Sequence, residues 1–166
     1  SLMDGIEEFD PQSFGVATVE GTFMDPQQRM LMQVCRSVLQ EQQLTIEPST
    51  SAVMVGISGN EYMHITKEVH TYSATGGTLS VASGRLAFTF GLQGPCMSVD
   101  TACSSSLVAT HFARSSILHH TSTGALACGV NVTLSPHTSA MFGIAGMLAP
   151  DGRCKTLDMN SDGYVR

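Results

Sequence analysis

Apolar residues recur along this chain with two spacings, which predict helices and strands in alternation. A spacing of three to four residues, typical of amphipathic helices, follows Asp25-Pro26 and then covers residues 78–88, the stretch after Cys103 to about residue 120, and residues 136–147. Short apolar runs, typical of buried strands, cover residues 52–57, 96–101 and 125–134. This order predicts an α/β protein with a mainly parallel sheet and helices on its faces.

The first long helix has a clear start in the sequence. Asp25 is a good N-cap, and Pro26 is favoured at the first helical position. The apolar positions expected on its buried face are Met30, Leu31, Val34, Val38 and Leu39. Polar stretches rich in glycine or proline predict loops over residues 58–77, 121–124 and from 150 onward. The first of these loops has room for one helical turn.

The segment from Gly94 to Leu107 places a thiol at a sharp turn. Gly94-Pro95 opens it, a short strand follows, and Cys103 stands directly before the next helix. The positive end of a helix dipole favours a thiolate, and small neighbours let a substrate carbonyl approach the sulfur. These neighbours are Ala102, Ser104 and Ser105. A buried structural cysteine is the commoner alternative, but the position on the turn favours a nucleophile.

The same residues resemble a known motif. Residues 100–109, Asp-Thr-Ala-Cys-Ser-Ser-Ser-Leu-Val-Ala, resemble the active-site motif of the β-ketoacyl synthases. The likeness is greatest to the ketosynthase domains of type I polyketide synthases and animal-type fatty acid synthases. Further segments resemble the family's landmarks in order: 9–14, 24–31, 83–95, 129–132, 150–154 and 162–166. The resemblance therefore extends over nearly the whole chain.

The resemblance implies a thiolase-like layered fold (α/β/α/β/α), to which residues 1–166 would contribute mainly the first half. It also implies that these residues are the N-terminal portion of a ketosynthase domain, incomplete at both ends. Cys103 would accept an acyl group from a thioester, and its backbone N–H would donate to the oxyanion. Substrates would arrive on the phosphopantetheine of an acyl carrier protein, with no cofactor bound directly. The implied partners are that carrier, other synthase domains and a second copy in a homodimer.

The family's two catalytic histidines lie in His-Gly-Thr-Gly-Thr and Asn-Ile-Gly-His type motifs, and neither motif occurs here. We assign no catalytic role to the six histidines of this chain: His64, His70, His111, His119, His120 and His137. A truncated or degenerate fragment with a structural or dimerising role is therefore the alternative to an enzyme. A thiolase fits less well, because its motif lacks the Asp-Thr-Ala-Cys-Ser-Ser-Ser context.

Composition narrows the class of protein further. Hydrophobic residues make up 42% of the chain and charged residues 13%, and the formal net charge is −6. This balance argues against nucleic acid or an anionic membrane as the main partner. Five cysteines without a Cys-x-x-Cys pair favour a reducing, cytoplasmic location, although organellar targeting stays open. No run of eighteen apolar residues predicts a membrane span.

Four other features have competing interpretations. Asp158-Met-Asn-Ser-Asp-Gly163 resembles the opening of an EF-hand loop, but Pro150-Asp-Gly-Arg cannot form the helix before it, so we predict no calcium site. Arg85 is expected in a structural ion pair. Cys96 and Cys128 are predicted to be small buried hydrophobes. Four apolar residues near the C-terminal end could line an acyl tunnel or pack in the core: Met141, Phe142, Met147 and Leu148.

Overall fold

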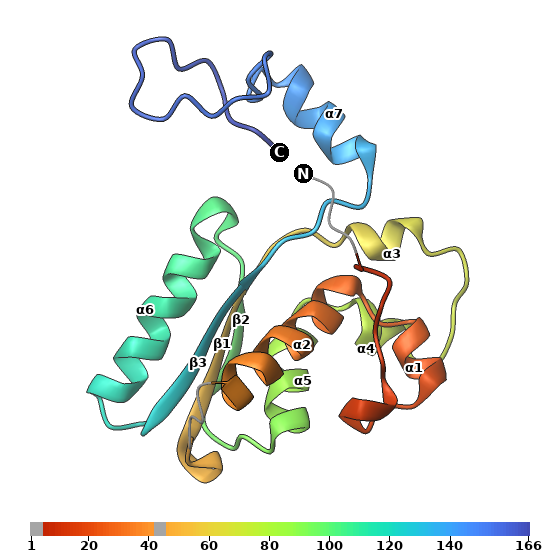
Figure 1. Ribbon diagram of the computed structural model, residues 1–166, viewed down its shortest axis with the longest axis vertical. Coiled ribbons are helices and arrows are strands. Elements are labelled where there is room, and N and C mark those ends of the chain that lie inside the picture. Colours follow the sequence, from red (N-terminus) through yellow and green to blue (C-terminus); the bar gives the residue numbers. More distant parts are fainter. Residues whose placement is uncertain (1–4, 42–45) are drawn as a thin grey trace. The chain divides into compact units, whose positions relative to one another are not determined.

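The computed structural model describes residues 5–41 and 46–166 (Figure 1). It divides into two compact units, residues 1–132 and 133–166, which we describe separately. The strands described in the structure all lie in the first unit: β1 (Ser51–Ile57), β2 (Cys96–Val99) and β3 (Gly124–Val130). Its longer helices are α2 (Pro26–Glu41), α5 (Val81–Phe90) and α6 (Ser105–Leu118). Its short helices are α1 (Thr18–Thr22), α3 (Glu61–Ile65) and α4 (Ser73–Gly77).

The sheet is parallel, as the alternating pattern predicts, with β1 between β2 and β3. All seven residues of β1 are buried, which explains why this strand reads as a continuous apolar run. Along β1, Val53 pairs with Cys96 of β2, and Gly56 pairs with Gly129 of β3. Because the strands run in one direction, their carboxyl ends share one edge of the sheet.

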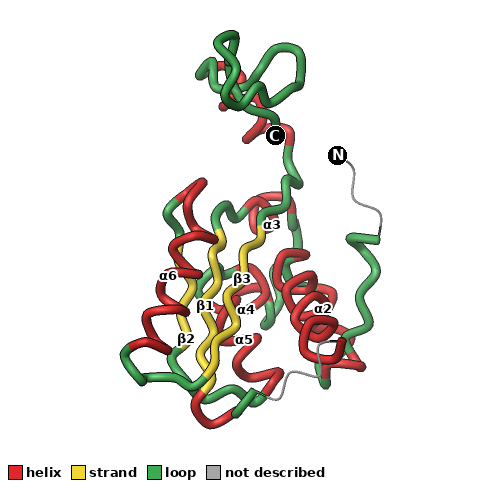
Figure 2. The backbone as a smooth tube through the Cα atoms, turned by 60° about the vertical axis from the view of Figure 1, so that its left-hand side comes forward, coloured by secondary structure: helices red, strands yellow, loops and turns green. Residues whose placement is uncertain are grey.

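Helices cover both faces of the sheet. Figure 1 and Figure 2 show α6 on one face, with α2 and α5 on the other. The larger core lies on the side of α2 and α5 and is formed by Met24, Leu31, Met32, Cys35, Val53, Val55, Ile57, Ala82, Leu86 and Leu92. On the side of α6, the core is formed by Ala52, Met54, Ala109 and Ala113, and its three alanines let the helix pack closely. This unit is thus an α/β/α layer.

Helix α2 begins as predicted but buries a different face. The Gln27 backbone N–H donates to Asp25 Oδ1 at 2.8 Å, so Asp25 is the N-cap. Leu31 is buried as expected, whereas Val34 and Val38 are 59% and 41% exposed. Both the buried and the exposed faces of α2 carry apolar residues, so the apolar spacing alone could not show that these two valines are exposed.

Several predicted boundaries differ from the structure. The segment 58–77 contains two short helices, α3 and α4, instead of one turn. The strand predicted over 96–101 ends at Val99, since the Asp100 side chain accepts a hydrogen bond from the Ala102 N–H at 2.9 Å and bends the chain. The strand predicted to reach residue 134 ends at Val130. Helix α6 ends at Leu118 and is capped by His119, close to the predicted end.

The second unit is small. It contains α7 (Pro136–Ile144), which begins at the predicted proline but ends before residue 147. Leu148 and Tyr164 then form an isolated parallel bridge. The ring of Tyr164 lies edge-on to Phe142 of α7, with 6.3 Å between the centroids. The second of these contacts ties the segment predicted to be loop from residue 150 onward back onto α7.

Candidate active site

Cys103 lies in a single 3-10 turn, Ala102–Ser104, between the end of β2 and the start of α6. Cys103 is exposed to solvent. The turn follows the carboxyl end of a parallel strand, which is the edge where α/β sheets present their ligand sites. The strand, sharp turn and helix predicted around this thiol are therefore confirmed.

The backbone at this turn is strained. Ala102 has a φ of 53°, in the left-handed region that residues with a side chain seldom adopt. Such a conformation costs on the order of 1 kcal/mol and persists only where the surroundings fix it. Ala102 therefore needs stabilising contacts on both sides.

Side-chain hydrogen bonds supply these contacts. Asp100 Oδ1 accepts from the Ala102 N–H at 2.9 Å, and Ser105 Oγ accepts from the Thr101 N–H at 2.9 Å. The Ser105 hydroxyl donates in turn to the Ala102 carbonyl at 2.7 Å. Ser104 Oγ donates to the Thr101 carbonyl at 2.9 Å. The hydroxyl residues around Cys103 thus hold the turn in place, a role that their small size alone did not reveal.

The other cysteines lie in different settings. Cys96 is exposed, so its prediction as a buried residue is wrong; it is the first residue of β2, at the edge of the sheet. Cys128 is partly buried, and its Sγ lies 3.6 Å from Sγ of Cys35, which is buried. The prediction for Cys128 is therefore correct in part, but it missed a thiol partner on α2.

All six histidines are exposed. The ring of His70 stacks on Phe23 with 4.6 Å between centroids, and His111 lies edge-on to Phe112 at 5.8 Å. His119 caps the end of α6, as its position in the sequence predicts. These placements give surface and capping roles to the histidines that we expected to be non-catalytic.

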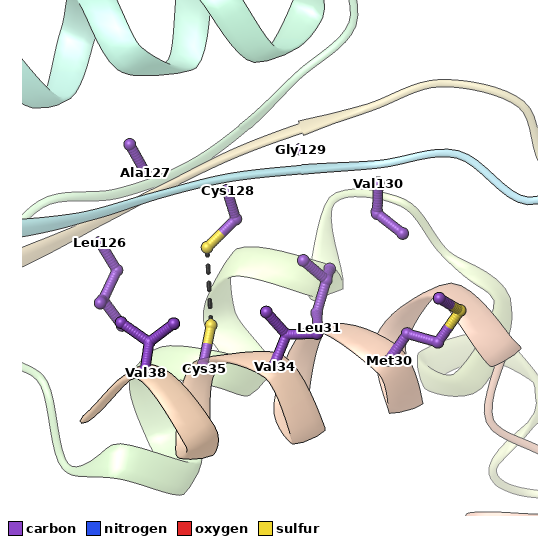
Figure 3. Close-up of a pocket in the computed structure, with 10 residues that line it drawn as sticks. All are labelled: Met30, Leu31, Val34, Cys35, Val38, Leu126, Ala127, Cys128, Gly129 and Val130. Carbon is purple, nitrogen blue, oxygen red and sulfur yellow. Dashed lines mark hydrogen bonds between the residues drawn. The ribbon is translucent and has the colours of Figure 1, made fainter. Parts of the chain in front are cut away.

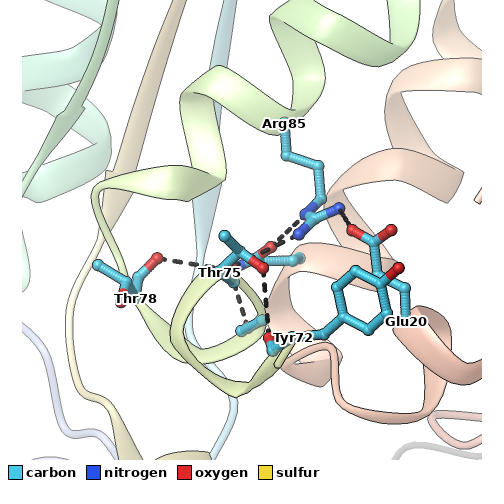
Figure 4. Close-up of polar contacts among 7 residues, drawn as sticks. Glu20, Tyr72, Thr75, Thr78 and Arg85 are labelled. Atoms are coloured by element: carbon cyan, nitrogen blue, oxygen red, sulfur yellow. Dashed lines mark hydrogen bonds and ion pairs between the residues drawn. The ribbon is translucent and has the colours of Figure 1, made fainter. Parts of the chain in front are cut away.

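Arg85 forms the predicted ion pair (Figure 4). Its Nη1 lies 2.7 Å from Glu20 Oε1, and its Nε donates to Gln28 Oε1 at 2.6 Å. The Arg85 side chain is 9% exposed. The pair joins α5 to α1 and α2, on the face of the sheet opposite α6, so it has a structural place in the fold.

The second unit contains the remaining predicted site residues. Met141 and Met147 are exposed, while Phe142 and Leu148 are partly buried, so the tunnel interpretation stays a prediction. In the EF-hand-like segment, Asp158 Oδ1 accepts from the Asn160 N–H at 2.8 Å. Asp162 Oδ1 is bound at 2.7 Å by the Lys155 ammonium, which competes with any cation there.

Within residues 5–41 and 46–166, no cluster of three or more His, Cys, Asp or Glu side chains has the arrangement of a metal site. None of the helices described in the structure combines the length and apolar character needed to cross a bilayer.

The parallel sheet and the thiol turn together define a thiolase-like α/β domain. The family described as Beta-ketoacyl synthase, N-terminal domain, matches residues 1–166, and the chain belongs to this family. The resemblance seen in the sequence is therefore confirmed.

Similar proteins narrow the class further. A phenolphthiocerol/phthiocerol polyketide synthase of Mycobacterium tuberculosis is 41% identical over 169 residues, covering 96% of this chain and 8% of that protein. The spectinabilin polyketide synthase system protein NorC of Streptomyces orinoci is 43% identical over 164 residues, covering 95% and 7%. The chain thus spans less than a tenth of these two relatives.

Solved structures agree with this assignment. The ketosynthase from module 6 of the bacillaene synthase of Bacillus subtilis superposes with a TM-score of 0.89 at 35% identity, covering 99% of this chain and 28% of that one. An oxazolomycin ketosynthase domain from Streptomyces albus gives a TM-score of 0.84 at 29% identity, covering 98% and 30%. The fold of this chain is that of the matching part of a polyketide ketosynthase.

Proposed function

We propose that residues 1–166 are the nucleophile-bearing, N-terminal portion of a ketosynthase domain, and that Cys103 is the acyl-accepting residue. The observation that carries this proposal is the exposed Cys103 thiol on a strained turn between β2 and α6. Asp100 and Ser105 hold that turn. Membership in the β-ketoacyl synthase family supports an acyl-transfer reaction at this thiol.

The first half of the proposed reaction is transacylation. The Cys103 thiolate attacks the carbonyl carbon of an acyl thioester carried on phosphopantetheine, and the thiol of the carrier arm leaves. Charge develops on the carbonyl oxygen in between. The Cys103 backbone N–H lies in the first turn before α6, where N–H groups have no acceptor within the helix, and it donates to this oxyanion.

The second half forms the carbon–carbon bond. A malonyl-type extender loses carbon dioxide, and its carbanion attacks the acyl group on Cys103, which releases the thiolate. The family resemblance implies that this step needs two histidines. None of the six histidines described above is assigned to it, so condensation is proposed for the ketosynthase that contains these residues and not for residues 1–166 alone.

The proposed partners follow from the relatives. The curated relatives are polyketide synthase proteins far longer than this chain, which supports other synthase domains and an acyl carrier protein as partners. A homodimer stays a prediction from the resemblance. A cytoplasmic location stays a prediction from the cysteine pattern.

The test is Cys103→Ala in the ketosynthase that contains these residues, incubated with an acyl N-acetylcysteamine thioester. We expect the variant to lose both the acyl adduct, measured by intact-protein mass, and the condensation product. Cys96→Ala and Cys154→Ala, which remove other exposed thiols, are the matched controls and should keep both. Acylation of the Cys103→Ala variant would refute the assignment. A wild-type protein that folds but takes no acyl group would favour the non-catalytic alternative.

A further inference from the structure

A pair of thiols lies on the face of the sheet opposite α6. Cys35 belongs to α2 and Cys128 to β3, 93 positions apart in the sequence, and their Sγ atoms lie 3.6 Å apart. Figure 3 shows the two side chains pointing toward each other from the helix and the strand. At this distance one thiol donates a hydrogen bond to the other, so the pair is in contact before any reaction.

The contact makes the two thiols differ in acidity. The hydrogen bond from Cys35 lowers the pKa of the Cys128 thiol, against the opposing effect of burial. The same hydrogen bond, together with burial, raises the pKa of Cys35. Cys128 is also the less buried of the two, so it is the sulfur that more readily becomes a thiolate, and Cys35 keeps its proton.

A groove of about 270 Å³ between α2 and β3 is lined in part by both thiols. Its lining is almost entirely apolar: Met30, Leu31, Val34, Cys35, Val38, Leu126, Ala127, Cys128, Gly129 and Val130. Val34 and Val38 are 59% and 41% exposed, so the groove opens to solvent along α2. Cys128 is partly exposed on its side of the groove.

We propose that Cys35 and Cys128 form a dithiol modification site, which a hydroperoxide converts to an intramolecular disulfide that joins α2 to β3. The Cys128 thiolate attacks the terminal peroxide oxygen and becomes a sulfenic acid, while the alkoxide takes a proton and leaves as an alcohol. Cys35 then attacks the Cys128 sulfur, and its proton leaves with the hydroxide as water. Two thiols and one hydroperoxide thus give one disulfide, one alcohol and one water.

The geometry requires only a small movement. A disulfide bond is about 2.05 Å long, so the two sulfurs must approach by roughly 1.5 Å. The two thiols lie on the side of the sheet that α2 covers, whereas Cys103 is at the turn that begins α6 on the other side. The site therefore does not depend on the proposed ketosynthase chemistry.

The experiment uses the 166-residue chain with Cys96→Ser, Cys103→Ser and Cys154→Ser, which leaves only the two proposed thiols. Hydrogen peroxide is added and quenched with catalase, and free thiols are then alkylated with N-ethylmaleimide in urea, which exposes the buried Cys35. We expect the intact mass to fall by two hydrogens with no alkylation, and peptide mapping to join Cys35 to Cys128. Dithiothreitol should restore both thiols. Adding Cys35→Ser as the matched control should abolish the disulfide and leave Cys128 as a sulfenic acid, trapped by dimedone.

Because the fold holds the two thiols in contact, we expect the disulfide to form about tenfold faster in buffer than in concentrated urea. Equal rates, or disulfides only between molecules, would overturn the proposal. A second test is independent of how the short chain folds. Cysteines placed at the two superposing positions of the bacillaene module 6 ketosynthase should also form a disulfide with peroxide. If both introduced cysteines of that ketosynthase stayed as free thiols after peroxide treatment, the result would contradict the proposed contact between α2 and β3.

Discussion

Gly56 of β1 and Gly129 of β3 are register partners, and the first turn of α6 lies directly on both. A Cβ atom at Gly56 would stand 2.5 Å from the carbonyl oxygen of Ser105. A Cβ atom at Gly129 would stand 2.6 Å from the Cβ of Ser106. These two glycines lie side by side on neighbouring strands. Because they have no side chains, the helix that follows Cys103 can lie directly on the sheet.

The first prediction concerns this close approach. Gly56→Ala should lower the free energy of unfolding by about 1–3 kcal/mol, because the new methyl group meets helix backbone that cannot rotate away. The shift of α6 should also slow acylation of Cys103. Urea unfolding and intact-protein mass measure the two effects. Gly84→Ala is the matched control: its Cβ would meet nothing within 4 Å, so we expect unchanged or slightly increased stability.

A double variant separates side-chain from backbone crowding. Gly129→Ala meets the Ser106 side chain, so Ser106→Gly should recover much of the lost stability in the Gly129→Ala background. The same Ser106→Gly should not rescue Gly56→Ala, whose contacts are with the backbone of Ser105 and Ser106, which the substitution leaves in place. Equal rescue in both backgrounds would argue against this view of how α6 lies on the sheet.

The sequence predicted features that depend on local patterns. The N-cap at Asp25, the buried run in β1 and the thiol turn at Cys103 were all visible, since each requires particular residues at neighbouring positions. The resemblance to ketosynthases then supplied the layered fold and the role proposed for Cys103, neither of which periodicity alone could give.

Features that depend on residues distant in the sequence were missed. The exposure of Cys96 follows from the position of β2 at the sheet edge, which a strand-like pattern does not encode. The Cys35–Cys128 contact and the Gly56–Gly129 pair each join segments that only the sheet register brings together. Both glycines could have been suspected as sites of close backbone approach, but their partners could not.

A second prediction concerns Arg85. Arg85→Met should lower the free energy of unfolding by roughly 1–3 kcal/mol, because Glu20 and Gln28 lose a donor in a partly buried setting. Arg85→Lys should restore little, since an ammonium cannot reproduce the two directed guanidinium contacts. Arg114→Met, at an exposed position of α6, is the control and should change stability by less than about 0.5 kcal/mol. Equal effects at both arginines in urea unfolding would contradict a specific role for the pair.

A third prediction concerns the accessibility of the thiols. In the reduced protein, iodoacetamide should modify Cys96, Cys103 and Cys154 well before Cys35, because these three are exposed and Cys35 is 4% exposed. Timed quenching and peptide mass mapping give the order. Denaturation in urea is the control and should remove the difference. Early modification of Cys35 under native conditions would show that α2 does not stay packed on the sheet.

The final prediction is a pH dependence at Asp25, whose side chain is almost fully buried at 1% exposure. Burial raises the pKa of this carboxyl above its ordinary value of 3.8, against hydrogen bonds from Gln27 and the charge of Arg29. At pH values above 3.8 the folded state therefore holds more of this proton than the unfolded state. The contribution of Asp25 to stability is complete below that pH and is lost as the pH rises through the raised pKa.

Asp25→Asn isolates this contribution, because asparagine keeps an oxygen for the Gln27 N–H but cannot ionise. Relative to the wild type, the variant should gain stability as the pH rises from about 4 to neutrality. Urea unfolding at several pH values measures the difference, in which the titration of all other groups cancels. Asp25→Ala, which removes the cap, should instead be less stable than Asp25→Asn by about 1 kcal/mol at every pH. Parallel pH profiles for the wild type and Asp25→Asn would show that burial at this position does not alter the ionisation of the carboxyl.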